Sequence, residues 1–379
     1  MMKRAAAVVL TAAALLLLSG AFGFKFSGYQ AQPANAVDPL TLSIDRAQQR
    51  LKAVPGDWQT WAALGSSYVE QARITGDPSF YHRADAALNK SHTLRPNDAA
   101  LTGLGALANA RHDFATAEGL ARQALTVNPA SATAYGVLVD ALTQLGRSQE
   151  ASEAVQRMLD LDPGLPALSR AAYDAEQHGH VDESRALWRR ALADAYGSNA
   201  LFVHQQLGDL AWHGGDLATA LAEYRIAGHQ LGLARVFAAR GETEAALGFY
   251  AALSATRPSI SLLAEYATLL RQQGRPAPAD AQLALADAAL ALLAASGGTD
   301  HLAAAEVAIA RGDFVSAVRF CEQEWSLRTH SDVADLLGWS LHLAGQDAKA
   351  LVYAQKAVAL GTRNRDYHAH LRAIEESLK

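Results

Sequence analysis

Thirteen histidines are the side chains of this chain that could most directly do chemistry, because imidazole binds metals and exchanges protons near neutral pH. Two pairs are closely spaced, His178-Gly179-His180 and His368-Ala369-His370. We expect the first pair in a turn between helices and the second on a C-terminal helix. Side chains at positions i and i+2 do not share a helix face, which argues against a chelate at the second pair. Solvated histidine is therefore the favoured interpretation of both pairs, and no metal site is predicted.

Other sequence patterns that would indicate catalysis are absent. The chain contains no H-E-x-x-H, no G-x-S-x-G and no G-x-x-x-x-G-K-[ST]. Gly232, Gly241 and Gly248 are interpreted as helix-turn glycines rather than a dinucleotide loop, since no strand is expected before them. The single cysteine, Cys321, allows no internal disulfide and no cysteine-based metal site, and we expect it in the core. We predict that the chain is not an enzyme and has no cofactor; an enzyme that uses its helices as a substrate platform is a minor alternative.

The elements that would hold functional side chains are paired helices. Trp61, Leu64, Gly65 and Tyr68 follow the pattern W-x2-L-G-x2-Y, and versions of this pattern recur along most of the chain. Small residues stand where helices must approach closely, and larger apolar residues stand where helices interlock. Glycine falls in the turns, where it relieves backbone strain, and a proline such as Pro129 marks the end of a second helix because it cannot continue it.

These residues resemble the tetratricopeptide repeat family, whose helical hairpins repeat about every 34 residues. About nine copies fit in near-register over residues 40–379. The resemblance implies an all-α fold, an α-α superhelix of about nine hairpins, with capping helices at Ser43 to Val54 and Asp366 to Lys379. Two irregularities are expected. Extra residues separate the helices of the first copy around Gly76-Asp77-Pro78, and shortened helices surround Gly228 to Gly232.

The resemblance also implies a concave groove that is lined by the first helix of each hairpin and binds polypeptide segments. By repeat phase, the predicted lining comprises Glu70, Asn109, Asp140, Gln144, Tyr173, Glu176, Gln177, Asp209, Trp212, His213, Arg235, Arg271, Glu306, Asp335, Trp339 and His342. Acidic side chains outnumber basic ones, and the exposed aromatics could anchor a peptide. The alternative is that Trp212 and Trp339 only pack against neighbouring helices. As peptide-binding residues we select Asp140, Tyr173, Gln177, Asp209, Trp212, Arg235, Arg271, Glu306 and Trp339.

Composition narrows the expected partners. The net charge is −5 and no Lys/Arg-rich stretch stands out, so nucleic acid is not an expected partner. Hydrophobic residues make up 50% of the chain, which is enough for a continuous core. We therefore expect a protein or peptide partner, whose identity the sequence does not give.

The N-terminal segment has the features of an export signal. Lys3 and Arg4 precede an uncharged stretch from Ala5 to Phe24. This arrangement suits either a cleaved signal peptide or a retained membrane anchor, and both place the rest of the chain outside the cytoplasm. The predicted organisation is a signal peptide or signal-anchor helix over 1–24, a linker over 25–39 and the repeats over 40–379. The expected location is extracytoplasmic, either membrane-anchored or secreted.

Two functions fit these observations. The first is an interaction scaffold of the cell envelope that binds polypeptide segments in its groove. The second is an extracytoplasmic assembly or chaperone factor for an envelope or secretion complex. A stable stoichiometric complex would favour the scaffold, whereas many transient clients would favour the chaperone.

Overall fold

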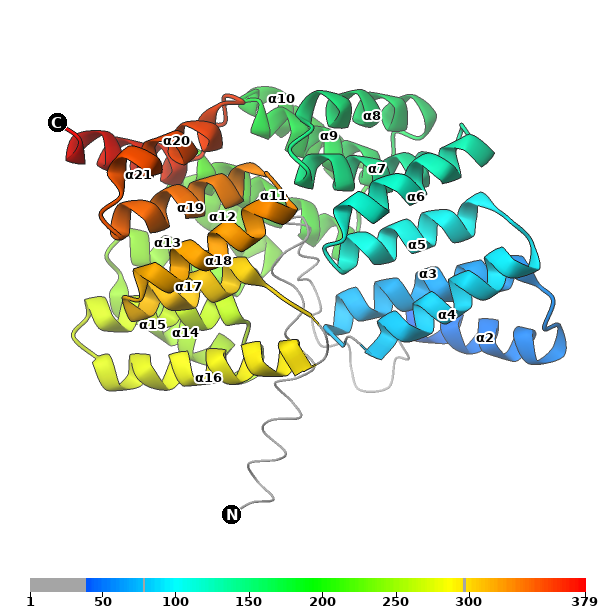
Figure 1. Cartoon of the computed structure of the whole chain (residues 1–379), viewed down its shortest axis with the longest axis horizontal. Coiled ribbons are helices and arrows are strands. Elements are labelled where there is room, and N and C mark those ends of the chain that lie inside the picture. The colour runs from blue at the N-terminus through cyan, green and yellow to red at the C-terminus, as the bar shows by residue number, and fades with distance from the viewer. Residues whose placement is uncertain (1–38, 78, 296–297) are drawn as a thin grey trace, which may run out of the picture. The chain divides into compact units, whose positions relative to one another are not determined.

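The computed structural model describes residues 39–77, 79–295 and 298–379, and every regular element in these ranges is an α-helix (Figure 1). The predicted export signal over 1–24 and the predicted linker, apart from Pro39, lie outside the described residues. The all-α prediction is confirmed. The helices form two compact units: unit 1 ends at Arg170, and unit 2 comprises residues 171–379. The prediction of one solenoid over 40–379 stays a prediction.

Unit 1 begins with a terminal helix, followed by hairpins in chain order. Its helices are α2 (Pro39–Ala53), α3 (Trp58–Thr75), α4 (Ser79–Leu94), α5 (Asp98–Ala110), α6 (Phe114–Val127), α7 (Ala132–Gln144) and α8 (Ser148–Leu161). The next helix, α9 (Leu165–Gln177), contains the boundary between the units. In the unit 1 hairpins α3–α4, α5–α6 and α7–α8, the odd-numbered helix comes first and packs against the even-numbered helix that follows it.

Unit 2 continues the hairpin pattern and ends with a single terminal helix. Its helices are α10 (Val181–Ala193), α11 (Ser198–His213), α12 (Leu217–Ala227), α13 (Gln230–Ala239), α14 (Thr243–Thr256), α15 (Ile260–Gln272), α16 (Pro276–Ala295), α17 (His301–Arg311), α18 (Phe314–Leu327), α19 (Ser331–Leu343), α20 (Asp347–Val358) and α21 (Arg365–Ser377). Nine hairpins therefore run from α3–α4 to α19–α20 in the described chain, as the repeat pattern predicts.

Local sequence explains where many second helices begin. An aspartate precedes α6, α12 and α18, and its carboxylate accepts a hydrogen bond from the backbone N–H three residues on, which caps the helix. At Asp216, hydrogen bonds from Thr219 lower the pKa of the carboxyl. Gly215 comes just before this cap and has φ +79, a left-handed conformation that glycine adopts without strain. The sharp turns before α12 and α18 follow from this Gly-Asp sequence, whereas His112 takes the left-handed conformation before α6.

Close helix approach depends on the small residues that the repeat pattern singles out. A Cβ added to Gly65 would lie 2.4 Å from Cγ of Leu88, and one added to Gly105 would lie 2.9 Å from Cγ1 of Val137. On the second helices, Ala84 and Ala117 are fully buried. The predicted packing role of these positions is confirmed.

The two predicted irregularities take definite forms. The extra residues of the first hairpin lengthen α3 to 18 residues rather than forming a long loop. The short sixth copy has an α12 of 11 residues and an α13 of 10 residues, with Gly228 at φ +64 between them. Gly232 allows the Tyr224 ring to approach α13, since a Cβ there would lie 2.6 Å from the ring. The shortened helices around Gly228 to Gly232 are thus confirmed.

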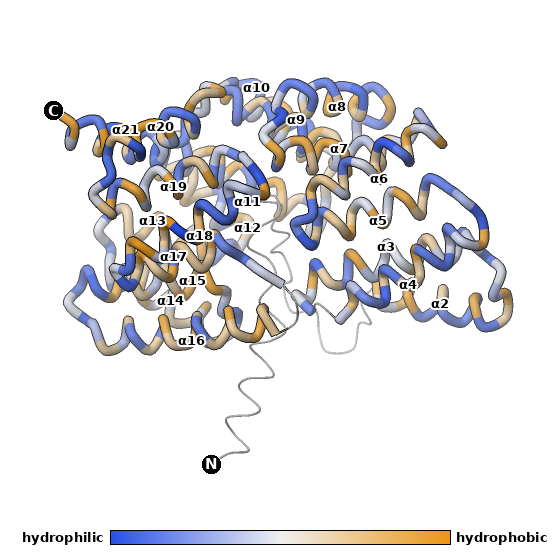
Figure 2. Tube along the Cα trace, viewed as in Figure 1, coloured by the Kyte–Doolittle hydropathy of each residue, from blue (hydrophilic) through white to orange (hydrophobic). Residues whose placement is uncertain are grey.

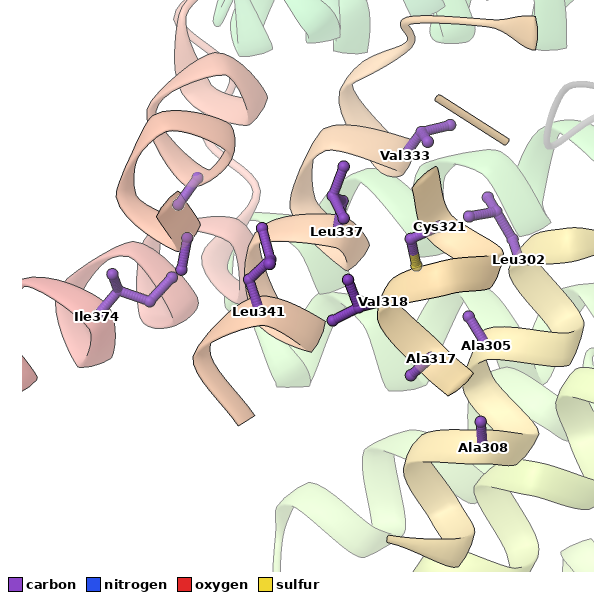
Figure 3. Close-up of a cluster of buried hydrophobic side chains, with 12 residues drawn as sticks. Leu302, Ala305, Ala308, Ala317, Val318, Cys321, Val333, Leu337, Leu341 and Ile374 are labelled. Carbon is purple, nitrogen blue, oxygen red and sulfur yellow. The ribbon is translucent and has the colours of Figure 1, made fainter. Parts of the chain in front are cut away.

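Figure 3 shows the core at the end of unit 2, where α17, α18 and α19 meet. Cys321 lies here with no exposed surface, and burial raises the pKa of its thiol to about 12. Val318 and Leu337 belong to the same cluster. The prediction that Cys321 is a core residue is confirmed. Figure 2 shows hydrophobic and hydrophilic residues alternating along most helices, as expected when one face packs and the other is solvated.

Among the described residues, α16 is the helix whose length and apolar composition would suffice to cross a membrane. Its contacts are those of a repeat helix. Leu283 and Leu293 are buried, and Asp287 pairs with Arg311 at 2.7 Å. It also packs against its hairpin partner α15. We therefore treat α16 as the second helix of the seventh hairpin.

Candidate functional site

Six residues on the first helices of unit 2 form what we call the inner row, and all six stand at the ninth position of the repeat, counted so that the small residue at the helix contact is the eighth. Each stands directly after the small residue at the helix contact, so successive hairpins place their ninth residues in equivalent positions. The inner row comprises Tyr173 of α9, Asp209 of α11, Arg235 of α13, Glu265 of α15, Glu306 of α17 and Trp339 of α19. Five of these six residues were predicted as groove residues, and Glu265 was not.

Tyrosines from the second helices hold the middle of the inner row. Tyr224 donates its hydroxyl to Oδ1 of Asp209 at 2.8 Å, and Tyr250 donates to Oε2 of Glu265 at 3.1 Å. Burial, followed by the adjacent carboxylate, raises the pKa of both phenols, so they stay protonated donors. The carboxylates are thereby fixed on rigid helices.

Arg235 links two hairpins by a two-pronged ion pair with Glu265. Burial opposes its charge, but the Glu265 carboxylate outweighs burial and raises the pKa of the guanidinium. The side chains remain 30% and 31% exposed, so solvent or a ligand can reach both. This pair presents charge on the inner face rather than filling the core.

Glu306 lies beside this pair and has an unsatisfied oxygen. Its Oε2 is buried and has no hydrogen-bond partner in the described structure. Burial raises the pKa of Glu306 to about 7; a hydrogen bond from Ser261 opposes this shift, and the negative charge of Glu265 adds to it. The inner row therefore contains one carboxyl group that changes its charge near neutral pH.

Three contacts join the beginning of unit 2 to its end. Nε2 of His330 lies 2.9 Å from the Tyr173 hydroxyl, and the two rings stack with centroids 6.3 Å apart. Ser331 donates its hydroxyl to Oε1 of Gln177 at 2.9 Å. Further along, the Arg365 guanidinium lies 4.6 Å from the centre of the Trp212 ring. Burial, and then the negative charge of Asp332, raises the pKa of Tyr173.

Histidines serve as partners of carboxylates around the inner row. Nδ1 of His213 lies 2.6 Å from Glu176, and although burial opposes it, the Glu176 carboxylate raises the pKa of His213. His370 pairs with Asp335 at 3.0 Å and stacks on Trp339 with ring centroids 4.2 Å apart. These contacts give most inner-face histidines a structural role.

The histidines of the two sequence pairs contact other groups of the protein. His368 contacts the carbonyl oxygen of Thr362, whereas His370 faces Asp335, so the two rings have different partners. His178 lies in the predicted place, just after α9, and contacts the carbonyl oxygen of Asp174. Within the described ranges, no group of three His, Cys, Asp or Glu side chains could hold a metal ion.

Eight of the nine selected residues lie in unit 2, and Asp140 lies in unit 1. Asp140 belongs to unit 1, where both of its oxygens accept hydrogen bonds from Arg170 at 2.7 and 2.6 Å. Arg271 donates to the Ala310 carbonyl at 2.7 Å and to Asp280 at 2.8 Å, so it connects α15 to its neighbours. Neither residue is part of the inner row of unit 2.

Some of the site residues that were not predicted could have been found from the spacing of charged residues in the sequence. Glu265 stands 30 residues after Arg235, as Arg170 stands 30 residues after Asp140. Opposite charges 30 residues apart on adjacent first helices therefore predict both pairs. His330 and Ser331 gave no such signal, because their partners lie 157 and 154 residues away.

Comparison with known proteins adds to this description. Residues 108–173 match the family profile described as tetratricopeptide repeat. The match supports the tetratricopeptide repeat family for this chain. No curated protein sequence matches the chain.

Solved structures show the same fold. The human IFIT1 dimer with m7Gppp-AAAA matches with a TM-score of 0.53 and 17% identity, over 84% of this chain and 77% of that chain. The human IFIT1 dimer with PPP-AAAA gives the same TM-score and identity, over 84% of this chain and 78% of that chain. At this identity the likeness shows the fold alone. The tetratricopeptide superhelix predicted from the repeats is thus confirmed as the fold class.

Proposed function

We propose that this chain is a protein-interaction scaffold that binds polypeptide segments on the inner face of unit 2. The observation that carries this proposal is the inner row, which combines aromatic, acidic and basic side chains at equivalent positions of successive hairpins. Tetratricopeptide repeats generally serve as non-catalytic scaffolds, and rigid helices fix the side chains before a ligand arrives. Preorganised groups lose little conformational entropy on binding, so they favour recognition.

The charges of the inner face favour a segment with basic residues. Asp209, Glu265 and Glu306 of the inner row face one cation, Arg235. Glu176 and Asp335 add two further carboxylates nearby, each beside a histidine. Carboxylates held between aromatic rings suit lysine or arginine side chains, which combine a charge with an apolar stem.

We further propose that the scaffold acts in the cell envelope. The support comes from the sequence: Lys3 and Arg4 precede the uncharged stretch from Ala5 to Phe24. An assembly or chaperone factor for an envelope complex is the second candidate. It shares the location and the inner face, and it differs in the number and lifetime of its partners.

Site-specific photo-cross-linking in the source cells tests this function. A photoreactive amino acid replaces Trp339 on the inner row. In the matched control, the same amino acid replaces Val315 on α18, which is 79% exposed. We expect polypeptide adducts at position 339 and not at position 315. One stoichiometric adduct supports the scaffold, and many weak adducts support the chaperone. No adduct at 339, or the same adducts at both positions, would overturn the proposal.

Fractionation of the cells tests the proposed compartment separately. The full-length chain should be found with the envelope or outside the cell. Deletion of residues 5–24 should retain it in the cytoplasm, because the uncharged stretch is the proposed export signal. Detection of the full-length chain only in the cytoplasm would contradict the envelope assignment without affecting the binding proposal.

A further inference from the structure

Unit 2 closes on itself, which an ordinary solenoid does not do. In a repeat protein, each hairpin contacts its neighbours only. Here the contacts Tyr173–His330, Gln177–Ser331 and Trp212–Arg365 join α9 and α11 to the N-terminal ends of α19 and α21. We call these three side-chain pairs the clasp.

Two glycines beside the clasp bring the backbones into contact. A Cβ added to Gly179 would lie 2.1 Å from the carbonyl oxygen of Gly361, and one added to Gly361 would lie 3.2 Å from the carbonyl oxygen of His178. Only the absence of a side chain at Gly179 permits this approach. The turn after α9 and the turn before α21 are therefore shaped to meet.

The clasp differs in kind from the packing between adjacent hairpins. Adjacent helices share clusters of buried apolar side chains, such as the cluster around Leu337 in Figure 3. The clasp consists of two hydrogen-bonded contacts, one of which also stacks the Tyr173 and His330 rings, and one contact between a cation and an aromatic ring. Water can replace such partners when the surfaces separate, so the net cost of opening is small compared with the cost of exposing a core.

The chain itself occupies part of its predicted groove through the clasp. Tyr173, Gln177 and Trp212 were selected as peptide-binding residues, and each is engaged by a side chain from the other end of unit 2. We propose that the clasp is an autoinhibitory contact that opens and closes and makes these three groove residues available only when open. Its consequence for partner binding rests on the proposed function; its existence as a switch does not.

A wedge at Gly179 tests whether the clasp can open. In Gly179→Ala, the new methyl group overlaps the Gly361 carbonyl, a backbone atom that cannot rotate away. Gly241→Ala is the matched control. Gly241 has φ +76, against +75 for Gly179, and stands in the equivalent turn, but a Cβ there would meet nothing within 4 Å. Both variants carry the same left-handed strain, and only the first opposes closure.

A thiol introduced into the clasp reports its opening. Ser331→Cys is nearly isosteric, and Ser331 is 8% exposed in the closed structure. The rate at which N-ethylmaleimide modifies the introduced thiol should follow the fraction of time that the clasp is open. Cys321, which has no exposed surface, is an internal control in the same molecule because it reacts only when the core unfolds. Mass spectrometry of peptides distinguishes the two thiols.

We expect the thiol of Ser331→Cys to react at least tenfold faster in the Gly179→Ala background than in the Gly241→Ala background or the parent, while Cys321 stays unmodified. Equal rates in all three backgrounds would overturn the proposal. Faster modification of both thiols would overturn it too, because the clasp would then be inseparable from the fold. No partner takes part in this assay, so a failure of the proposed binding function would leave its result unchanged.

A second variant keeps the test decisive if Gly179→Ala does not fold. Tyr173→Phe removes the hydroxyl that meets His330 and retains the stacked ring. It should raise the modification rate of the thiol introduced by Ser331→Cys several-fold. Tyr196→Phe, at an 85% exposed tyrosine on the surface of unit 2, should leave the rate unchanged. Indistinguishable rates for these two variants would overturn the clasp as a switch.

Discussion

Units 1 and 2 are built from the same hairpin, yet they use its ninth position differently. In unit 1 this position holds Ser66 in α3, Ala106 in α5 and Asp140 in α7. In unit 2 every first helix places a charged or aromatic side chain there. The same fold thus has two small residues and one aspartate at this position in unit 1, and a chemically varied set of side chains in unit 2. Repeat register alone therefore does not locate a binding face.

The two units also differ in the sequence separation between the residues that contact each other. Ion pairs and hydrogen bonds of unit 1 join neighbouring hairpins, as between Arg147 and Glu118, 29 residues apart, or Arg170 and Asp140, 30 residues apart. Unit 2 has such pairs too, and it also has the clasp, whose hydrogen bonds span 154 and 157 residues. Unit 1 is thus stabilised by contacts between neighbouring hairpins, whereas unit 2 is also stabilised by contacts between its first and last helices.

Buried charge should produce the largest difference between the units. Arg328 is 2% exposed and pairs with Glu324, which is 4% exposed, and with Asp332. Arg328→Leu leaves the Glu324 carboxylate buried without its partner and should lower the free energy of unfolding by about 3–5 kcal/mol. Arg147→Leu, in unit 1, removes a 39% exposed arginine and should cost about 0–1 kcal/mol. Hydrogen exchange of α18 and α8 amides measures both, and equal losses would contradict the comparison.

Helix contacts should give the next largest effect. Gly338→Leu in unit 2 directs its Cβ at a backbone nitrogen, that of Ala354, 2.9 Å away, and should destabilise the chain by about 3 kcal/mol. Gly105→Leu in unit 1 meets the Val137 side chain, which can change rotamer, and should cost about 1–2 kcal/mol. Thermal denaturation followed by circular dichroism compares them. An unchanged melting temperature for both would mean that the repeat register is wrong.

Glu306 should make the stability of unit 2 depend on pH. Its pKa in the fold, about 7, lies above the unfolded value of about 4.3, so its neutral form is favoured in the folded chain. The resulting stabilisation is fully present below the unfolded value and is lost as the pH rises through about 7. Glu306→Gln should match the parent at pH 5 and exceed it at pH 8.5 by on the order of 2 kcal/mol.

The equivalent change in unit 1 is the control for Glu306. Asp140→Asn removes a carboxylate that is already paired with Arg170, so it should not stabilise the chain at either pH. Denaturant titrations at pH 5 and pH 8.5 give all the required values. If Glu306→Gln and the parent respond identically to pH, then burial does not raise the pKa of Glu306 in solution.

Removal of one tyrosine hydroxyl should have the smallest effect. Tyr224→Phe removes the hydroxyl that donates to Oδ1 of Asp209, which then keeps only the longer hydrogen bond from Gln206, and should cost about 1 kcal/mol. Tyr81→Phe in unit 1 loses only a 3.3 Å contact with the Ala110 carbonyl and should cost less than about 0.5 kcal/mol. Denaturant titration monitored by circular dichroism resolves the difference, and a larger loss for Tyr81→Phe would reverse the order of the two units.

The fold could be predicted from the sequence because each repeat position is determined by contacts within its own hairpin and with the neighbouring hairpins. Gly105 and Cys321 could be assigned to a helix contact and to the core, since each position depends only on neighbouring hairpins. The short helices around Gly228 were predictable for the same reason. What looked like extra loop around Gly76 instead lengthened α3, because nothing in that stretch before Gly76 prevents a helix from continuing.

The candidate site was predictable only in part, and the limit is physical. Asp209, Arg235 and Glu306 were placed on the inner face by register alone. Their partner Tyr224 lies on the second helix of the Asp209 hairpin, and Glu265 lies at the position of the next hairpin equivalent to Arg235, so both were within reach of the local repeat spacing. His330 could not be found in this way. Its contact with Tyr173 depends on the cumulative rotation of all intervening hairpins, and no short stretch of sequence specifies that sum.

Closure of unit 2 also restricts how its length can change. An open solenoid can gain or lose a hairpin by duplication or deletion, because the new end resembles the old one. In unit 2, one inserted or deleted hairpin would move His330 away from Tyr173 and Gly361 away from Gly179. The contacts that close unit 2 therefore fix the number of hairpins between α9 and α21.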